Sequence, residues 1–288
     1  IEKSKEVTTV AVKVFSMYGM SLNFNPNKSE LIVAFVGKGA KYARAALVEA
    51  QNIIPIEWQG TEIALRVVKS YKHVGSSISV SSQIGEEICA RCGIMRTESM
   101  RLGKYVLKAR SISLEMKILT IQAFILSKGS FQCGTWPRLS DAQYKQFHTC
   151  IVSIYRHASG NYYKPVHSSD AESFEPKAIF CDDDLIHRYG FMCPRTVIRL
   201  ARISLFIRIV MKSPPHLAEL AKLSTDYEKG WANATLSDLR WLSASPKFSD
   251  CSAYSWDQWV ACFQDEPKVK YNSMRVFCKS PFANICGQ

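Results

Sequence analysis

The chain has 288 residues, of which 47% are hydrophobic and 22% are charged, a composition typical of a globular protein with a sizeable core. Lysine and arginine outnumber aspartate and glutamate by 37 to 25, and this formal net charge of +12 favours a polyanionic partner. The most apolar stretch, residues 197–211, contains three arginines, which argues against a membrane-spanning helix and a membrane partner.

The positive charge is concentrated in the first part of the chain. Residues 1–160 contain 21 basic and 11 acidic side chains, whereas residues 161–288 contain 16 and 14. This net charge of +10 against +2 predicts that residues 1–160 contact the polyanion, although a solvated charged surface would give the same balance. Ten cysteines, most of them within apolar periodic segments, predict reduced thiols and hence a nuclear or cytoplasmic protein.

Strand patterns dominate the first part of the chain after one initial helix. Apolar residues at positions 7, 10, 14 and 18 form a helical stripe that ends at Gly19. A short helix is expected within residues 37–52, and Gly60 is placed to supply the positive φ of a hairpin turn. Strand-type runs occur at residues 22–24, 31–36, 54–58, 63–68 and 71–80.

The remaining chain has helical periodicity. Ser140 with Gln143 three residues later forms a capping-box pattern, and Pro194 is suited to the first position of a helix. The polar, irregular residues 161–180 predict a linker. The expected helices cover residues 84–106, 114–126, 141–157, 194–212, 215–223, 231–242 and 256–262.

These patterns predict an α+β fold. Residues 1–80 are expected to form a small antiparallel sheet with a packed helix. Residues 81–160 are expected to form a helical domain, and residues 161–288 a C-terminal helical extension.

Two motifs point to a known family. The sequence from Leu22 to Glu30 reads Leu-Asn-Phe-Asn-Pro-Asn-Lys-Ser-Glu, and it follows the predicted helix and Gly19. The sequence from Tyr71 to Ser76 reads Tyr-Lys-His-Val-Gly-Ser. Together they resemble the end of the palm and the start of the thumb in the reverse transcriptase of a non-LTR (LINE-type) retrotransposon.

The resemblance implies roles for residues in both motifs. Lys28 would approach the triphosphate of the incoming nucleotide, where an ammonium group can neutralise developing charge or protonate the leaving pyrophosphate. Tyr71, His73 and Gly75 would belong to a hairpin that grips the primer strand. This chain departs from the family pattern by having His73 for an aromatic residue and Val74 for leucine.

The helical region from residue 84 to residue 157 resembles the thumb of such enzymes. Its motifs follow the family order: an acidic-apolar pair with Arg91, then Lys117, then Gly-Thr-Trp at 134–136. Arg101, Lys104 and Lys108 are spaced i, i+3 and i+7, which predicts one basic helix face that tracks phosphates, or a solvated charged face. Arg110 and Lys117 would extend that face.

Other constellations are assigned structural roles. Cys89 and Cys92 are spaced like a zinc knuckle, but without a second ligand pair nearby they predict two buried structural thiols. Cys181, His187 and Cys193 lack the family's zinc spacing, so no metal site is predicted. The aspartates at 182–184 fit a helix start. Four tryptophans predict core packing rather than base stacking, at positions 231, 241, 256 and 259.

The family resemblance implies a parent activity of RNA-templated DNA synthesis with Mg²⁺ and deoxynucleoside triphosphates. The metal-binding aspartates would lie upstream of residue 1, so no cofactor is expected in this chain and catalysis would need the missing palm. The implied partners are RNA and a DNA primer-template duplex. Two alternatives remain open: a nucleic-acid-binding module without catalysis, and the product of a decayed element without a selected role.

Overall fold

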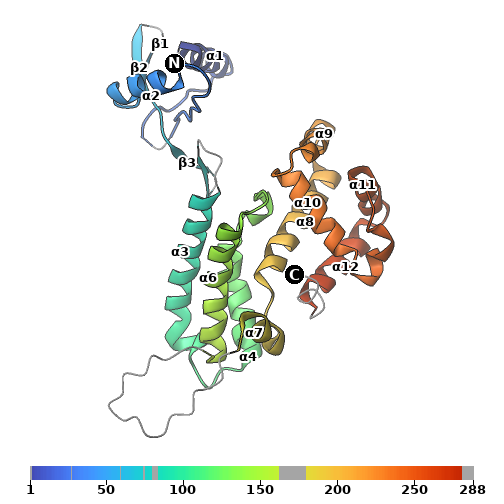
Figure 1. Ribbon diagram of the computed structural model, residues 1–288. Coiled ribbons are helices and arrows are strands. Elements are labelled where there is room, and N and C mark those ends of the chain that lie inside the picture. Colours follow the sequence, from blue (N-terminus) through green and yellow to red (C-terminus); the bar gives the residue numbers. More distant parts are fainter. Residues whose placement is uncertain are drawn as a thin grey trace, which may run out of the picture. The chain divides into compact units, whose positions relative to one another are not determined.

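Figure 1 shows the computed structural model, which describes residues 2–26, 28–58, 60–73, 75–79, 84–161 and 180–280. The chain forms two compact units, residues 1–86 and residues 87–288. In the described parts of the chain the strands lie in the first unit and helices dominate the second, which confirms the predicted α+β fold. None of the described helices is long and apolar enough to cross a lipid bilayer.

The first unit contains two helices and two hairpins. Helix α1 is Glu2–Met17 and helix α2 is Ala40–Glu49; the strands are β1 (Ile53–Trp58), β2 (Thr61–Arg66), β3 (Ser70–His73) and β4 (Ser76–Ser79). β1 and β2 pair antiparallel, as do β3 and β4. Gly60 has a φ of +73°, which confirms its predicted role in the first hairpin turn.

A small apolar cluster lies between the first hairpin and helix α2. Ile54 and Ile56 of β1 alternate with exposed residues, so both side chains point to the same face of the hairpin. They pack with Leu65 of β2 and Leu47 of α2. Because an isolated two-stranded hairpin is only marginally stable in water, this packing and the contact of α1 with β1 are needed to stabilise it.

Helix α1 presents a different face to the hairpin from the one that its apolar stripe predicts. Its buried residues are Thr8 and Val12. The four stripe residues are all exposed: Val7 at 61%, Val10 at 55%, Val14 at 45% and Tyr18 at 76%. The periodicity therefore predicted a helix correctly but did not predict which face packs.

Two predicted strands are absent from the first unit. Residues 22–24 and 31–36 have no extended pairing except for one isolated bridge between Leu31 and Val67. The backbone amide of Leu31 donates to the carbonyl of Arg66, and Val68 donates back to Leu31. The predicted single strand over 71–80 is instead the β3–β4 hairpin, with Val80 outside the described residues.

The first half of the second unit is a helical bundle. Its elements are α3 (Gly85–Leu102), the π-helical turn η1 (Gly103–Leu107), α4 (Leu114–Thr120), the π-helical turn η2 (Ile121–Leu126), α5 (Ser127–Gly129), the 3₁₀ turn η3 (Cys133–Thr135) and α6 (Asp141–Ser159). The capping box of Ser140 and Gln143 is formed with both hydrogen bonds, as predicted. Most of the predicted linker, residues 162–179, lies outside the described residues.

The second half of this unit contains α7 (Asp182–Tyr189), α8 (Pro194–Lys212), α9 (Pro215–Leu223), the 3₁₀ turn η4 (Ser224–Asp226), α10 (Trp231–Leu242), the 3₁₀ turn η5 (Pro246–Cys251), α11 (Trp256–Asp265) and α12 (Pro267–Lys279). Pro194 begins α8 and Ser213 ends it before the two prolines, as expected. The final helix, α12, was not predicted, although Pro267 at its first position was an available signal.

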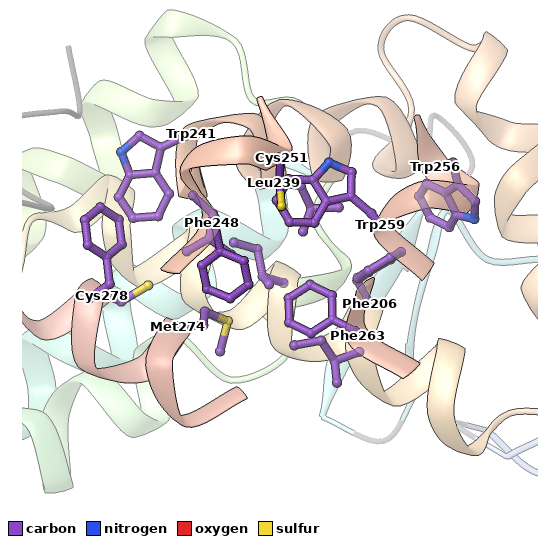
Figure 2. Packing of buried hydrophobic residues seen from close by; sticks show 14 of the residues in the cluster. Phe206, Leu239, Trp241, Phe248, Cys251, Trp256, Trp259, Phe263, Met274 and Cys278 are labelled. Carbon is purple, nitrogen blue, oxygen red and sulfur yellow. The ribbon is translucent and has the colours of Figure 1, made fainter. Parts of the chain in front are cut away.

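Aromatic residues fill the core of this second half (Figure 2). Phe206 of α8 meets Trp256 edge-on, with ring centroids 4.9 Å apart. Phe263 and Trp259 of α11 lie against the same core and are fully buried. Trp241 is also buried, whereas Trp231 is only partly buried, so the tryptophans act mainly as core residues, as predicted.

The Gly-Thr-Trp segment connects the two halves of the second unit through η3 and α8. A Cβ atom on Gly134 would lie 2.6 Å from the carbonyl oxygen of Ala201, so only glycine allows the two backbones to approach this closely. The indole of Trp231 donates a hydrogen bond to the carbonyl of Gly134. The ring of Trp136 is buried and meets Phe147 of α6 edge-on at 5.3 Å.

We expect Gly134→Ala to lower the stability of the second unit by about 1–3 kcal/mol, the usual cost of overpacking, because the new methyl group must displace α8. Gly93→Ala in α3 is the matched control, since a Cβ atom there meets nothing within 4 Å. The control should gain about 0.5–1 kcal/mol from higher helix propensity. Urea unfolding of both variants measures the difference, and equal stabilities would contradict the close approach of η3 to α8.

Candidate nucleic-acid interface

In the first unit, Lys28 and Tyr71 lie close together although 43 residues separate them in sequence. The Tyr71 hydroxyl donates a hydrogen bond of 2.8 Å to the backbone carbonyl of Lys28. The turn before Lys28 is closed by its own amide, which donates to Asn25, and by the amide of Ser29, which donates to Asn23. The Lys28 side chain is exposed, and Asn27 lies outside the described residues.

The β3–β4 hairpin contains the other two residues that the family resemblance assigns to primer binding. His73 pairs with Ser76 across the turn. Gly75 has a φ of +84°, a conformation that favours glycine, so the turn itself accounts for this residue. Val74 and the side chain of His73 lie outside the described part of the structure. The primer contact stays a prediction.

In the second unit, a basic segment occupies the end of α3 and the residues after it. We use the name basic segment for Arg101, Lys104, Lys108 and Arg110, all of which are exposed. The sequence contains no acidic residue between positions 99 and 114. A row of exposed cations without intervening acids can contact successive phosphates.

Two of the basic segment's side chains have local contacts. Arg101 pairs with Glu98 at 3.4 Å, but 72% of its side chain is exposed. The Lys104 ammonium lies 5.3 Å from the centre of the Tyr105 ring, which is itself 71% exposed. The π-helical turn from Gly103 interrupts the α-helical spacing between these residues, so the predicted single face of an α-helix is not formed exactly.

Lys117, the fifth residue assigned to this surface, contacts the protein itself. Its ammonium group donates to the carbonyl oxygen of Ala158 at 3.4 Å. Ala158 is in the last turn of α6, where free carbonyls and the helix dipole favour a cation. This contact gives Lys117 a structural role beside the predicted one.

Arg91 also has a structural role. It forms a buried ion pair of 2.6 Å with Glu87 one turn earlier in α3, and the two side chains are 6% and 4% exposed. Its guanidinium lies 5.0 Å from the ring centre of Phe131 and donates to the carbonyl of Lys128. The acidic-apolar-basic motif of the sequence therefore joins α3 to the segment after α5.

The sequence predicted that both cysteines of α3 are buried, and this prediction is wrong for one of them. Cys89 is exposed and Cys92 is buried. The Cys92 thiol donates to the carbonyl of Gln146 and the Cys150 thiol to the carbonyl of Cys92. The nearby Cys150 thiol and burial together raise the pKa of Cys92.

The aspartate run begins α7, as predicted. The Cys181 sulfur accepts a hydrogen bond from the amide of Asp184, and all three aspartates lie in the first turn. Asp182 pairs with Arg156 of α6 at 2.6 Å and with His148 at 3.6 Å. Across residues 84–161 and 180–280, and in the described part of the first unit, no three His, Cys, Asp or Glu side chains are grouped to hold a metal ion.

Comparison with known proteins gives no relative. No protein-family model, no curated protein and no solved structure matches this chain.

Sequence reasoning missed a second group of cations, on α8. Arg195, Arg199 and Arg202 are spaced i, i+4 and i+7, so they share one face of the helix. Of these, Arg199 and Arg202 lie in the apolar stretch 197–211, whose arginines argue against a membrane span, and Arg195 precedes it. Their spacing was visible, but their partners, Asp238 and Trp241 of α10, could be identified only in the folded chain.

We expect Arg91→Met to destabilise the protein far more than Arg101→Met, although both change an arginine of α3. Arg91→Met leaves the Glu87 carboxylate buried without its partner and should cost roughly 3–5 kcal/mol. Arg101→Met alters an exposed pair and should change stability by less than about 1 kcal/mol. Guanidinium unfolding measures both, and similar losses would contradict the structural assignment of Arg91.

Proposed function

We propose that this chain binds an RNA–DNA duplex through phosphate contacts, as the C-terminal part of a non-LTR retrotransposon reverse transcriptase. The observation that carries the proposal is the basic segment, in which four exposed cations lie within ten residues without an acidic residue between them. Tyr105 exposes an aromatic face within the same segment. Cations with an aromatic residue are typical of surfaces that bind nucleic-acid strands independently of sequence.

The chemistry of the basic segment suits backbone binding better than base recognition. Lysine is a point charge on a flexible stem, and two of the four residues are lysines. Each cation that neutralises a phosphate releases counterions, so affinity should fall steeply with salt. Arg101 lies in α3 and Lys104 in the π-helical turn, whereas Lys108 and Arg110 follow in non-helical chain.

Features of the first unit support the polymerase origin. The turn that presents Lys28 contacts the β3–β4 hairpin through Tyr71, as expected if both surround one substrate path. None of the described residues covers the apolar stripe of α1. An exposed apolar stripe of this kind is expected if the sheet domain of the intact polymerase contains additional chain that packs on it. Nucleotide binding by Lys28, with Mg²⁺, would then belong to the intact polymerase.

The alternative of a binding module without catalysis rests on the same basic segment. The second unit has its own core and presents the segment without help from a nucleotide site. In that case duplex binding is the whole function. If the chain binds no nucleic acid, we would interpret it as the product of a decayed element without a selected role.

We expect Arg101→Glu/Lys104→Glu/Lys108→Glu to weaken binding to a labelled RNA–DNA duplex at least tenfold at low salt. The slope of log affinity against log salt should fall by about 3, because up to three phosphate contacts are lost. Fluorescence anisotropy over a salt titration measures both quantities.

The control is Lys229→Glu/Arg240→Glu/Lys268→Glu, which changes the net charge equally at three exposed positions elsewhere in the second unit. It should retain most of the affinity and the original slope. If both triple variants lost the same affinity, binding would depend on the net charge of the chain and not on the basic segment. Absence of binding by the folded wild-type chain would refute the proposal.

We expect no primer extension by the purified chain with Mg²⁺ and all four deoxynucleoside triphosphates, because the family resemblance places the metal-binding aspartates upstream. A denaturing gel of the extended primer measures this. Extension by the wild-type chain that persists after removal of contaminating polymerases would overturn the assignment of this chain as a part without its catalytic centre.

A further inference from the structure

Two of the three arginines on one face of α8 share a single carboxylate. Arg202 is fully engaged: it donates to the carbonyls of Trp136 and Pro137 and pairs with Asp238. Arg199 lies 3.5 Å from the other oxygen of Asp238. Arg195 adds a third positive charge one turn before Arg199. Two guanidinium groups against one carboxylate leave an excess of one positive charge.

Arg199 is surrounded by protein, and Asp238 is its only ion-pair partner among the described residues. Only 13% of its side chain is exposed, and its guanidinium lies 4.5 Å from the ring centre of Trp241. Its Nε, which lies 3.5 Å from Asp238, and its Nη1 are buried, and neither has an acceptor in hydrogen-bond geometry among the described residues. The indole Nε1 of Trp241 is in the same condition. Two residues in contact therefore contribute three buried donors without acceptors.

Such a group of donors is unfavourable unless an acceptor occupies the site. Buried polar atoms in folded proteins are nearly always paired, and an unpaired donor loses its hydration without compensation. Burial lowers the pKa of Arg199, and the nearby Arg195 lowers it further, whereas Asp238 opposes both. A bound anion would satisfy the donors and offset the excess charge together.

Two further residues next to this group are only partly buried. Arg195 stacks over the ring of Tyr144 at 4.6 Å. Burial raises the pKa of Tyr144 to about 12, so its hydroxyl is neutral at physiological pH. Cys193 is the remaining titratable group that acts on Arg199.

We propose that Arg199, Trp241 and Arg195 form a binding site for a phosphate group. The planar guanidinium fork of arginine matches the oxygens of phosphate, and its stacking on Trp241 fixes the plane in which the fork lies. The site is separate from the basic segment and goes beyond the proposed duplex contact. The phosphate comes either from a free nucleotide or from a nucleic-acid strand.

The first test is thermal unfolding of the full chain in inorganic phosphate and in sodium chloride of equal ionic strength. The wild-type Tm should rise with phosphate concentration, because a ligand that binds only the folded state stabilises it. Arg199→Met should lose this rise and should be at least as stable as wild type in chloride, since its unpaired donors are gone. Arg199→Lys, which keeps the charge without the fork, should shift the apparent Kd at least tenfold.

Arg208→Met is the matched control, because Arg208 is exposed on the same helix. It should keep the wild-type response to phosphate. Phosphate also stabilises proteins by exclusion from their surfaces, so a rise that Arg199→Met retains would overturn the site. An equal Tm of wild type in the two salts would overturn it as well.

The source of the phosphate is identified by comparing a 5′-phosphorylated mononucleotide with the RNA–DNA duplex as ligands. Weaker mononucleotide binding by Arg199→Met with unchanged duplex binding assigns the site to free nucleotides. Weaker duplex binding assigns it to a strand phosphate, and no change with either ligand refutes the site. The triple variant of the basic segment should keep the phosphate-dependent rise in Tm, so failure of the duplex proposal and failure of this one are distinguishable.

Discussion

The second unit depends on the interactions of the buried Arg202 guanidinium. It donates to the carbonyls of Trp136 and Pro137, and it pairs with Asp238 of α10. These partners are 65 or 66 residues before it and 36 residues after it, so one side chain joins the bundle, α8 and the aromatic core. Removing one partner of a buried charge costs roughly 3–5 kcal/mol. Substituting only one of these contacting residues would therefore destabilise the unit.

The position of Arg202 determines what the rest of α8 can do. With Arg202 directed at η3 and α10, the same helical face brings Arg199 against Trp241 and Asp238. One oxygen of Asp238 accepts from Arg202, and the other lies 3.5 Å from the Nε of Arg199 without forming a hydrogen bond. The proposed phosphate site is thus a consequence of how the two halves of the unit are joined.

Local signals in the sequence predicted much of the fold. The capping box at Ser140 and the proline at 194 specify helix starts through hydrogen bonds and backbone angles that need only neighbouring residues. The hairpin around Gly60 is specified in the same way. Partners distant in sequence could not be predicted, and these decide which face of α1 packs and which thiol of α3 is buried.

The candidate interface shows the same division. Sequence alone identified the basic segment, because exposed charges in a row need no distant partner to be recognised. It could not separate these cations from Arg91 or Lys117, whose partners lie within the fold. Nor could it predict the π-helical turn at Gly103, which changes the spacing of the predicted basic face.

The net charge of the chain is therefore a poor guide to where a polyanion binds. Arg91 and Arg156 are paired with carboxylates inside the second unit, and these pairs stabilise helix packing. Lysine and arginine residues that lack such partners are the ones whose field extends into solvent. In the basic segment, three of the four side chains have no acidic partner among the described residues, and the fourth, Arg101, is 72% exposed. Because helix packing uses other arginines, the fold leaves this segment available for phosphate contacts.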